Sequence, residues 1–216
     1  MISLLKAIRR KCMAAGRAIG TTFGFLVRKA HAPALPANPD GKVYVNLGAG
    51  RNTSAEFINI DTRTMPNVHY IHEVQKLPML ADDSVDLLYA SHLVEHIPRT
   101  EIPATMLEWK RVLKPGGVLR FGVPDFDALV KIYGLSGNEV DSIVNQLLGQ
   151  DAPYDDHHTI WNLAYARKLL EAAGFRNVRL WDAKTADHHA FNDKTLRVVK
   201  VGSQDIPISL NVEATK

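Results

Sequence analysis

The fold follows from one stretch near the start of the main domain, Val43-Tyr44-Val45-Asn46-Leu47-Gly48-Ala49-Gly50. Its apolar part predicts a short buried strand, and its two glycines predict a tight turn directly after it. A second apolar run, Glu56-Phe57-Ile58-Asn59-Ile60-Asp61, ends on a carboxylate eleven residues after Gly50. In α/β proteins such glycines let the backbone approach a ligand, and such a carboxylate accepts hydrogen bonds from ribose hydroxyls. The two runs together predict a nucleoside-binding site.

From residue 42 onward, short apolar runs alternate with segments of helical periodicity. We expect strands at 43–47, 57–60, 85–90, 117–123, 177–182 and 208–215, and helices at 101–113, 125–133, 138–148 and 163–173. Strands separated by helices predict an α/β protein with a doubly wound, mainly parallel sheet. Only nine residues separate the first two strands, which is fewer than a parallel crossover helix needs. The first crossover is therefore expected to be truncated to a loop or a single turn.

Composition limits the classes of protein to which the chain can belong. Its 216 residues, 46% of them hydrophobic, suffice for one full core. The single cysteine, Cys12, excludes an intramolecular disulfide and gives no sign of a cysteine zinc site. The net charge is +3, but residues 1–39 hold seven basic and no acidic residues, which leaves 19 basic against 23 acidic residues in 40–216. The mildly acidic main part indicates no nucleic-acid partner.

Residues 1–39 differ in composition from the main domain at 40–216. Apolar residues recur there at three- and four-residue spacing beside basic ones, which predicts an amphipathic helix within 1–31; they are Leu4, Leu5, Ile8, Cys12, Ala15 and Ile19. We expect this helix to lie on an anionic membrane surface. A helix that packs on the domain and a targeting peptide are the alternatives. The Pro-containing stretch 32–39 is expected to be a linker.

Three further segments follow the glycine turn in a fixed order: residues 77–96, 108–120 and 169–175. With the turn, they resemble class I S-adenosylmethionine-dependent methyltransferases over roughly residues 42–216. The chain is similar in particular to small bacterial methyltransferases often encoded beside cell-surface polysaccharide genes. Those share the turn Asn46–Gly50, the strand end Val123-Pro124-Asp125 and the terminal Ser209–Lys216. The resemblance implies a seven-stranded Rossmann-like sheet and S-adenosyl-L-methionine as the cofactor.

The resemblance also implies which residues contact the cofactor. The turn would present N–H groups to the methionine part, and Asp61 would accept hydrogen bonds from both ribose hydroxyls. Glu73 and Val74 would lie beside the adenine, although the segment before them is one residue shorter than in the family. The expected cofactor-binding residues are Asn46, Gly48, Ala49, Gly50, Asp61, Glu73, Val74, Ser91, His92 and Leu93.

The stretch His92-Leu93-Val94-Glu95-His96 also matches the His-x-x-Glu-His pattern of inverted zinc peptidases. In that interpretation His92 and His96 hold zinc, and Glu95 is the general base of a hydrolase. The same residues continue a methyltransferase strand and loop, so we expect packing, hydrogen bonding or ligand contact there, and no metal. A degenerate methyltransferase fold that serves only as an interaction module is a second alternative, against which the intact glycine turn and Asp61 argue.

A second histidine cluster, Asp155-Asp156-His157-His158-Thr159-Ile160-Trp161, lies where this fold inserts a lid over the methyl acceptor. The family resemblance places a histidine at His157, four residues before the aromatic Trp161. Methyl transfer to a hydroxyl requires alignment of the acceptor and removal of its proton. We expect His157 to be the base, with Asp125 second. A solvated loop histidine and a metal site made of Asp155, Asp156 and His157 are the alternatives, whereas His188 and His189 are expected at the surface.

These observations predict a methyltransferase that O-methylates a sugar, a glycan or a glycan precursor. The substrate class is implied by the family resemblance. We expect a cytoplasmic protein that can associate with the inner face of the membrane through residues 1–31. A nicotinamide dehydrogenase is disfavoured because a third glycine is missing after Gly50 and because Asp61 follows the turn too early.

Overall fold

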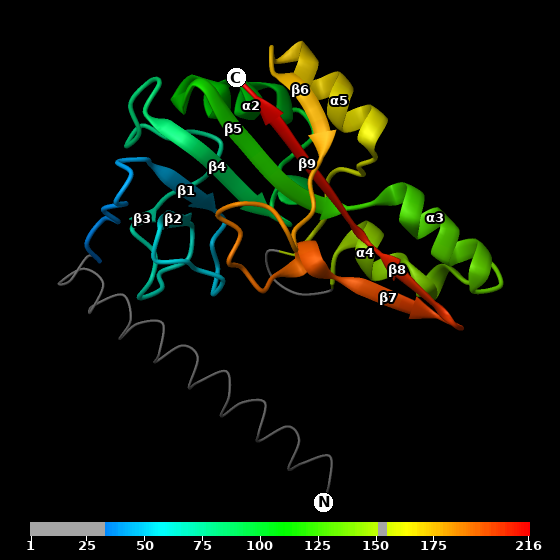
Figure 1. The fold of residues 1–216 in the computed structure, drawn as a ribbon. Coiled ribbons are helices and arrows are strands. Elements are labelled where there is room, and N and C mark those ends of the chain that lie inside the picture. The colour runs from blue at the N-terminus through cyan, green and yellow to red at the C-terminus, as the bar shows by residue number, and fades with distance from the viewer. Residues whose placement is uncertain (1–32, 151–154) are drawn as a thin grey trace, which may run out of the picture.

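The computed structural model describes residues 33–150 and 155–216, so the predictions for residues 1–31 lie outside the described part. Seven strands form one sheet in the order β3-β2-β1-β4-β5-β9-β6 (Figure 1). β9 is antiparallel to both of its neighbours, and the other strands are parallel to one another. The strands are β1 (Tyr44–Leu47), β2 (Phe57–Asp61), β3 (Tyr70–Ile71), β4 (Val85–Ser91), β5 (Leu113–Pro124), β6 (Arg176–Leu180) and β9 (Ser209–Thr215).

All helices of the described residues follow β4. They are η1 (Val94–His96), α2 (Ile102–Val112), α3 (Phe126–Leu135), η2 (Val140–Ser142), α4 (Val144–Leu148), α5 (Leu163–Ala172) and η3 (Lys194–Leu196). None of the described helices is long and apolar enough to cross a membrane. A two-stranded hairpin of β7 (Val198–Val201) and β8 (Gln204–Pro207) precedes β9. The mainly parallel sheet with helices is therefore confirmed, and the first crossover between β1 and β2 contains no helix, as its length requires.

One face of the sheet is covered by α2 and α5. Their buried residues form one apolar cluster with the inward side chains of the central strands, such as Val45, Leu88 and Phe121. Trp109 of α2 is fully buried, and its indole N–H donates to the Val74 carbonyl at 2.8 Å. That bond satisfies the one polar atom of a large apolar side chain and ties α2 to the loop after β3.

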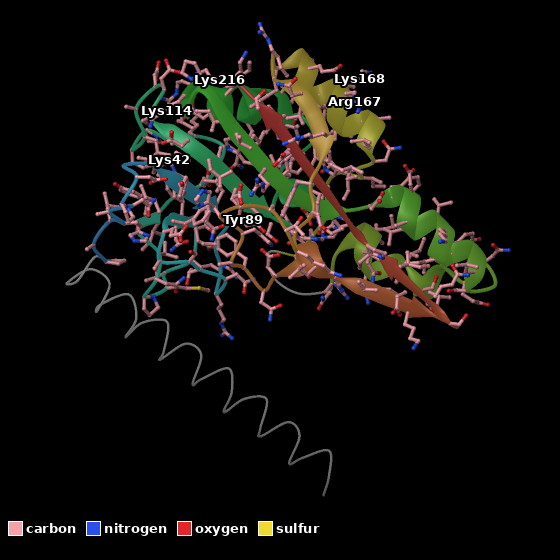
Figure 2. The ribbon with its side chains drawn as sticks, viewed as in Figure 1. Lys42, Tyr89, Lys114, Arg167, Lys168 and Lys216 are labelled. Atoms are coloured by element: carbon pink, nitrogen blue, oxygen red, sulfur yellow. The ribbon has the colours of Figure 1, made fainter. Side chains whose placement is uncertain are left out.

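The opposite face is covered by the segment 181–197 in place of helices. Tyr89 lies near the middle of the sheet (Figure 2) and stacks in parallel on Phe191, with ring centroids 4.7 Å apart. His189 joins this aromatic cluster, with its ring 4.9 Å from that of Trp181. The prediction that His189 is a surface residue is therefore wrong, because the segment folds over the aromatic side chains that the missing crossover helices leave uncovered. His188 is exposed, as expected.

A third group of elements extends beyond the end of β5. The helix α3, the short helix α4 and the hairpin β7–β8 pack together around a separate apolar cluster whose members are Leu129, Ile132, Ile143, Ile206 and Ile208. The helix α3 begins at Phe126, and Asp125 caps it by accepting a hydrogen bond from the Asp127 N–H at 3.1 Å. This group lies beside the carboxyl edge of the sheet, where parallel strands place ligands.

Candidate functional site

The glycine turn lies at the carboxyl end of β1. Gly48 and Gly50 adopt φ angles of +61° and +54°, which side-chain-bearing residues rarely adopt. A Cβ atom on Gly48 would lie 2.7 Å from Cδ1 of Leu93, so that glycine is also required by a close approach. The Ala49 N–H donates to the Ile60 carbonyl at 3.2 Å, which ties the turn to β2.

Asn46 supports this turn from within the sheet. It is buried, and its amide donates to the Asn52 carbonyl at 2.9 Å and to Oδ1 of Asn59 at 3.1 Å. Both partners are protein atoms, so the structure uses Asn46 to hold the loop after the glycines in place. The sequence predicted a ligand contact here, and the geometry assigns the Asn46 amide a positioning task.

Asp61 ends β2 directly beside the glycine turn. Its buried carboxylate accepts hydrogen bonds from the Gly50 N–H and the Arg63 N–H, both at 2.8 Å. The Arg63 guanidinium completes the set with Nε 2.9 Å from Oδ1 and Nη2 3.0 Å from Oδ2. Burial raises the pKa of Asp61, but the hydrogen bonds from Arg63 and Gly50 outweigh it and hold the pKa below its usual range. The carboxylate is therefore ionised and oriented toward the turn.

Glu73 and Val74 follow β3 and point into different environments. Val74 is buried in the core beneath α2, whereas Glu73 is exposed. Of this pair, only the Glu73 side chain is free to reach a ligand at the sheet edge.

Ser91, His92 and Leu93 follow the end of β4. Leu93 packs over Gly48, and His92 adopts a left-handed φ of +47°. The His92 N–H donates to the Gly122 carbonyl at 2.7 Å, and its ring nitrogens lie 3.1 Å from Ser209 Oγ and 3.1 Å from Glu95 Oε1. Residues Val94–His96 form a single 3-10 turn, not the α-helix that the zinc-peptidase pattern requires. Both nitrogens of His92 have protein neighbours, so the hydrolase interpretation is not favoured.

His157 lies in the segment between α4 and α5, and its ring packs edge-on against that of His96, with centroids 4.9 Å apart. Its Nδ1 is 2.9 Å from the Gln146 carbonyl. A carbonyl oxygen only accepts, so Nδ1 carries the proton and Nε2 has a free lone pair. Burial lowers the pKa of His157, which keeps the ring neutral near pH 7. These are the properties required of a general base.

Backbone hydrogen bonds join the segment that contains His157 to the residues that follow β4 and β5. The His158 N–H donates to the Glu95 carbonyl at 2.7 Å, and the Phe126 N–H donates to the Trp161 carbonyl at 2.9 Å. Asp125, the second predicted base, makes a backbone bridge with Trp161 and caps α3. Burial raises the pKa of Asp125. His157 and Asp125 thus both lie next to the carboxyl edge of the sheet. One oxygen of the Asp125 carboxylate is already used to cap α3.

The sequence does not indicate that Glu95 and His96 meet His157. The three residues offer ligand atoms within 4.8 Å of one another, although 60 residues separate His96 from His157. The predicted alternative of Asp155, Asp156 and His157 does not form such a group in the described residues. The Asp155 carboxylate lies near the group, with Oδ1 3.9 Å from His96 Nε2, and Asp156 contacts His96 through its carbonyl. No local signal in the sequence marks this long-range contact.

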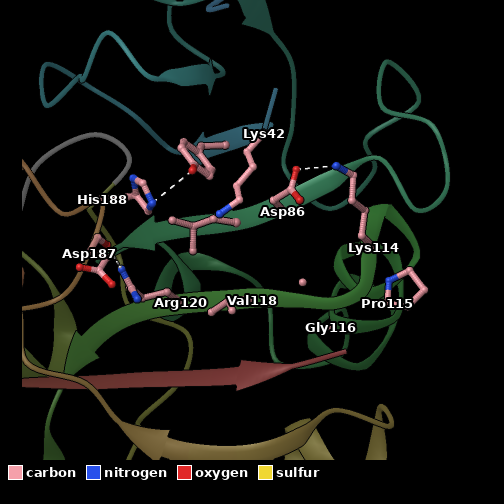
Figure 3. A pocket seen from close by; sticks show the side chains of 12 residues that line it. Lys42, Asp86, Lys114, Pro115, Gly116, Val118, Arg120, Asp187 and His188 are labelled. Atoms are coloured by element: carbon pink, nitrogen blue, oxygen red, sulfur yellow. Dashed lines mark hydrogen bonds and ion pairs between the residues drawn. The ribbon is translucent and has the colours of Figure 1, made fainter. Parts of the chain in front are cut away.

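A pocket of about 310 Å³ lies at the opposite edge of the sheet, where β1, β4 and β5 begin (Figure 3). Lys42, Lys114 and Lys216 lie at this edge (Figure 2). The charged groups are already paired, since Lys114 Nζ lies 2.6 Å from Asp86 and Arg120 donates to the Asp187 carbonyl at 2.7 Å. None of the predicted site residues lines this pocket. The candidate site is therefore the carboxyl edge.

Comparisons with known proteins agree with this geometry. Residues 46–121, which contain the glycine turn, Asp61 and β4, match the methyltransferase domain family. This match, together with the fold shared with solved structures, supports an S-adenosylmethionine-dependent methyltransferase domain. The paired glycines and the ionised Asp61 fit S-adenosyl-L-methionine as the cofactor of such a domain. No curated protein matches the chain.

The methyltransferase domain is similar in fold to several solved structures. An S-adenosylmethionine-dependent methyltransferase of Archaeoglobus fulgidus is 14% identical, with a TM-score of 0.51 over 81% of this chain and 86% of that one. A methyltransferase of Mesorhizobium loti is 17% identical, with a TM-score of 0.51 over 88% and 96% of the two chains. A putative methyltransferase of Haloferax volcanii is 18% identical, with a TM-score of 0.51 over 94% of each chain.

Proposed function

We propose that the methyltransferase domain methylates a hydroxyl group of a sugar, a glycan or a glycan precursor. The observation that carries the reaction type is the free Nε2 lone pair of His157 on the segment that is fastened beside the carboxyl edge. The substrate class is supported by the resemblance of the Asn46–Gly50 turn and of the terminal strand Ser209–Lys216 to methyltransferases encoded beside polysaccharide genes.

In the proposed reaction, some residues bind the cofactor and another removes the proton of the acceptor. When bound, S-adenosylmethionine supplies a methyl group on a positively charged sulfur. Asp61 holds the ribose, the turn at Gly48 and Gly50 presents N–H groups to the methionine part, and Glu73 reaches toward the adenine. His157 Nε2 accepts the hydroxyl proton as the oxygen–methyl bond forms and the sulfur–methyl bond breaks, with that electron pair left on the sulfur. Removal of the proton by a positioned base typically contributes a factor of about 10²–10⁴.

The proposal includes the place where the reaction occurs. Residues 1–31, with their basic residues beside an apolar stripe, would hold the protein at an anionic membrane surface. In this proposal, that position would bring the site to an acceptor at the membrane surface.

Transfer of labelled methyl groups tests the function. The full-length protein is incubated with S-adenosylmethionine labelled in the methyl group and with separate sets of sugar nucleotides, oligosaccharides, phenols and amines. We expect label on a sugar hydroxyl, and a loss of most of that label with His157→Gln. Label that accumulates only on amines or phenols would contradict the proposed substrate class.

A further inference from the structure

We propose that Glu95, His96 and His157 bind one divalent metal ion of the zinc class, at the side of the site where the methyl acceptor enters. These residues are called the Glu95–His96–His157 cluster below. The role of the ion in catalysis rests on the proposed function, but the binding itself does not.

The geometry of the cluster fits such an ion. One imidazole nitrogen from each histidine and one Glu95 oxygen lie within 4.8 Å of one another. Ligands bound to tetrahedral zinc at about 2.0–2.1 Å are about 3.3 Å apart. A small inward movement of the three side chains therefore closes the site. Two histidines and one glutamate are a known ligand set of catalytic zinc, which leaves one position open.

The hydrogen bonds of the two histidines point to the same function. His96 Nδ1 lies 3.0 Å from the Asp156 carbonyl, and His157 Nδ1 lies 2.9 Å from the Gln146 carbonyl. Because carbonyl oxygens only accept, both Nδ1 atoms carry protons and both Nε2 atoms present lone pairs. Metal-binding histidines are typically oriented in this way, with the second ring N–H donated to a carbonyl or carboxylate.

Glu95 supplies a second and independent observation. Its side chain is 0% exposed, yet neither carboxylate oxygen accepts a hydrogen bond of proper geometry. Among the described residues, the only ionisable group at ion-pair distance from Glu95 is the His92 ring, whose Nδ1 lies 3.1 Å from Oε1. A buried carboxylate without hydrogen bonds is costly unless a cation compensates it. An ion on the histidine side of Glu95 would provide that compensation.

The cluster also joins two parts of the fold that form the site. Glu95 and His96 follow β4, and His157 belongs to the segment before α5. The Glu95 carbonyl accepts the His158 N–H, so the two backbones are already in contact. Among the described residues, the nearest further carboxylate to this side of the cluster at ion-pair distance is that of Asp155, with Oδ1 3.9 Å from His96 Nε2.

The ion would change how the acceptor is activated. A hydroxyl bound at the open position loses its proton more easily, because the positive charge lowers its pKa. The proton is then released to solvent, and the oxygen attacks the methyl group while the electron pair of the breaking bond stays on the sulfur. In this arrangement His157 is a ligand, and the ion takes over the task of the base.

Metal titration of the full-length protein, freed of any affinity tag and stripped with a chelator, tests the proposal. Calorimetry with Zn²⁺ and visible absorption with Co²⁺ are measured for wild type, Glu95→Gln, His96→Gln and His157→Gln. His158→Gln is the matched control, because His158 is the exposed neighbour of His157. We expect one equivalent bound by wild type and by the control, and an affinity at least about tenfold lower in each cluster variant.

The alternative outcomes are distinct. Absence of binding by wild type, or equal affinity in wild type and the cluster variants, overturns the metal site. His96 is partly exposed, so His96→Gln keeps the test valid if the buried Glu95→Gln fails to fold. Metal bound by the cluster without methyl transfer to any sugar contradicts the proposed function alone. If methyl transfer depends on His157 but the active protein contains no metal and is not inhibited by chelators, only the metal site is contradicted.

Discussion

The Arg63 guanidinium donates two hydrogen bonds to the Asp61 carboxylate, with Nε 2.9 Å from Oδ1 and Nη2 3.0 Å from Oδ2. Asp61 is buried, whereas the Arg63 side chain is 51% exposed and can turn away into solvent. The carboxylate that we expect to bind the ribose is thus kept ionised by a partner that competes with the ribose hydroxyls for the same oxygens.

Arg63→Ala tests this competition. Without the guanidinium, the cofactor no longer has to displace an ion pair, and a half-exposed pair of this kind is worth about 0.2–1 kcal/mol. We expect S-adenosylmethionine to bind up to about fivefold more tightly in calorimetry. Arg176→Ala, an exposed arginine of β6 at the far edge of the sheet, is the control and should not change the affinity. Weaker binding by Arg63→Ala would mean that Arg63 itself holds the cofactor.

Gly48→Ala should reduce stability for two separable reasons. The φ of +61° strains any side-chain-bearing residue, and the new Cβ would meet Leu93 at 2.7 Å. Gly137→Ala is the matched control, since Gly137 has a φ of +77° but no atom within 4 Å of its Cβ position. We expect a loss of about 1–3 kcal/mol for the strain alone in Gly137→Ala and a larger loss in Gly48→Ala, measured by urea unfolding. Equal losses would show that the contact with Leu93 is unimportant.

Most of the sheet could be predicted from the sequence because its central strands are short, mainly apolar runs, as in β1 and β4. The hairpin β7–β8 was missed because its residues are largely exposed, and only Ile206 is buried. The position of His189 was wrong because the segment over the sheet is set by packing against Tyr89 and Trp181, which no local pattern reveals.

The candidate site was predictable only in part, because several of its contacts join residues that are distant in the sequence. The glycine turn and Asp61 are local features of two strand ends, and the structure places them side by side. The ion pair between Asp61 and Arg63 and the contact between His96 and His157 depend on the folded chain. Sequence patterns identified the residue types of the site but not which side chains meet.

His157→Gln should lower turnover by roughly 10²–10⁴-fold and leave the affinity for the cofactor nearly unchanged. Whether His157 is the base or a metal ligand, its ring must be neutral. Because burial lowers its pKa from the usual 6.5, wild-type activity should be constant near pH 7 and fall only as the pH drops through that lowered value. A pH–rate profile of wild type shows this limb, and the residual activity of the variant should lack it. Turnover close to wild type in His157→Gln would move the base to Asp125 or leave alignment alone.

Residues 1–31 are expected to bind vesicles that contain anionic lipid, and the binding should weaken as salt rises because several Lys and Arg residues take part. Co-sedimentation with vesicles measures it. Deletion of residues 1–35 should abolish the binding and keep the affinity for the cofactor, since Gly48 and Asp61 lie beyond the deleted segment. If the full-length protein ignores such vesicles at low salt and the deletion lowers the melting temperature, the segment packs on the domain.

The cofactor site is tested most directly by calorimetric titration of the wild-type protein and of Asp61→Ala with S-adenosylmethionine. Wild type should bind one equivalent, and Asp61→Ala should bind at least about tenfold more weakly, because a charged acceptor of this kind contributes about 1.5–3 kcal/mol. The melting curves of both proteins verify that the variant is folded at the temperature of the titration. Failure of the wild type to bind, or equal affinity in a folded Asp61→Ala, would contradict a cofactor site between the glycine turn and Asp61.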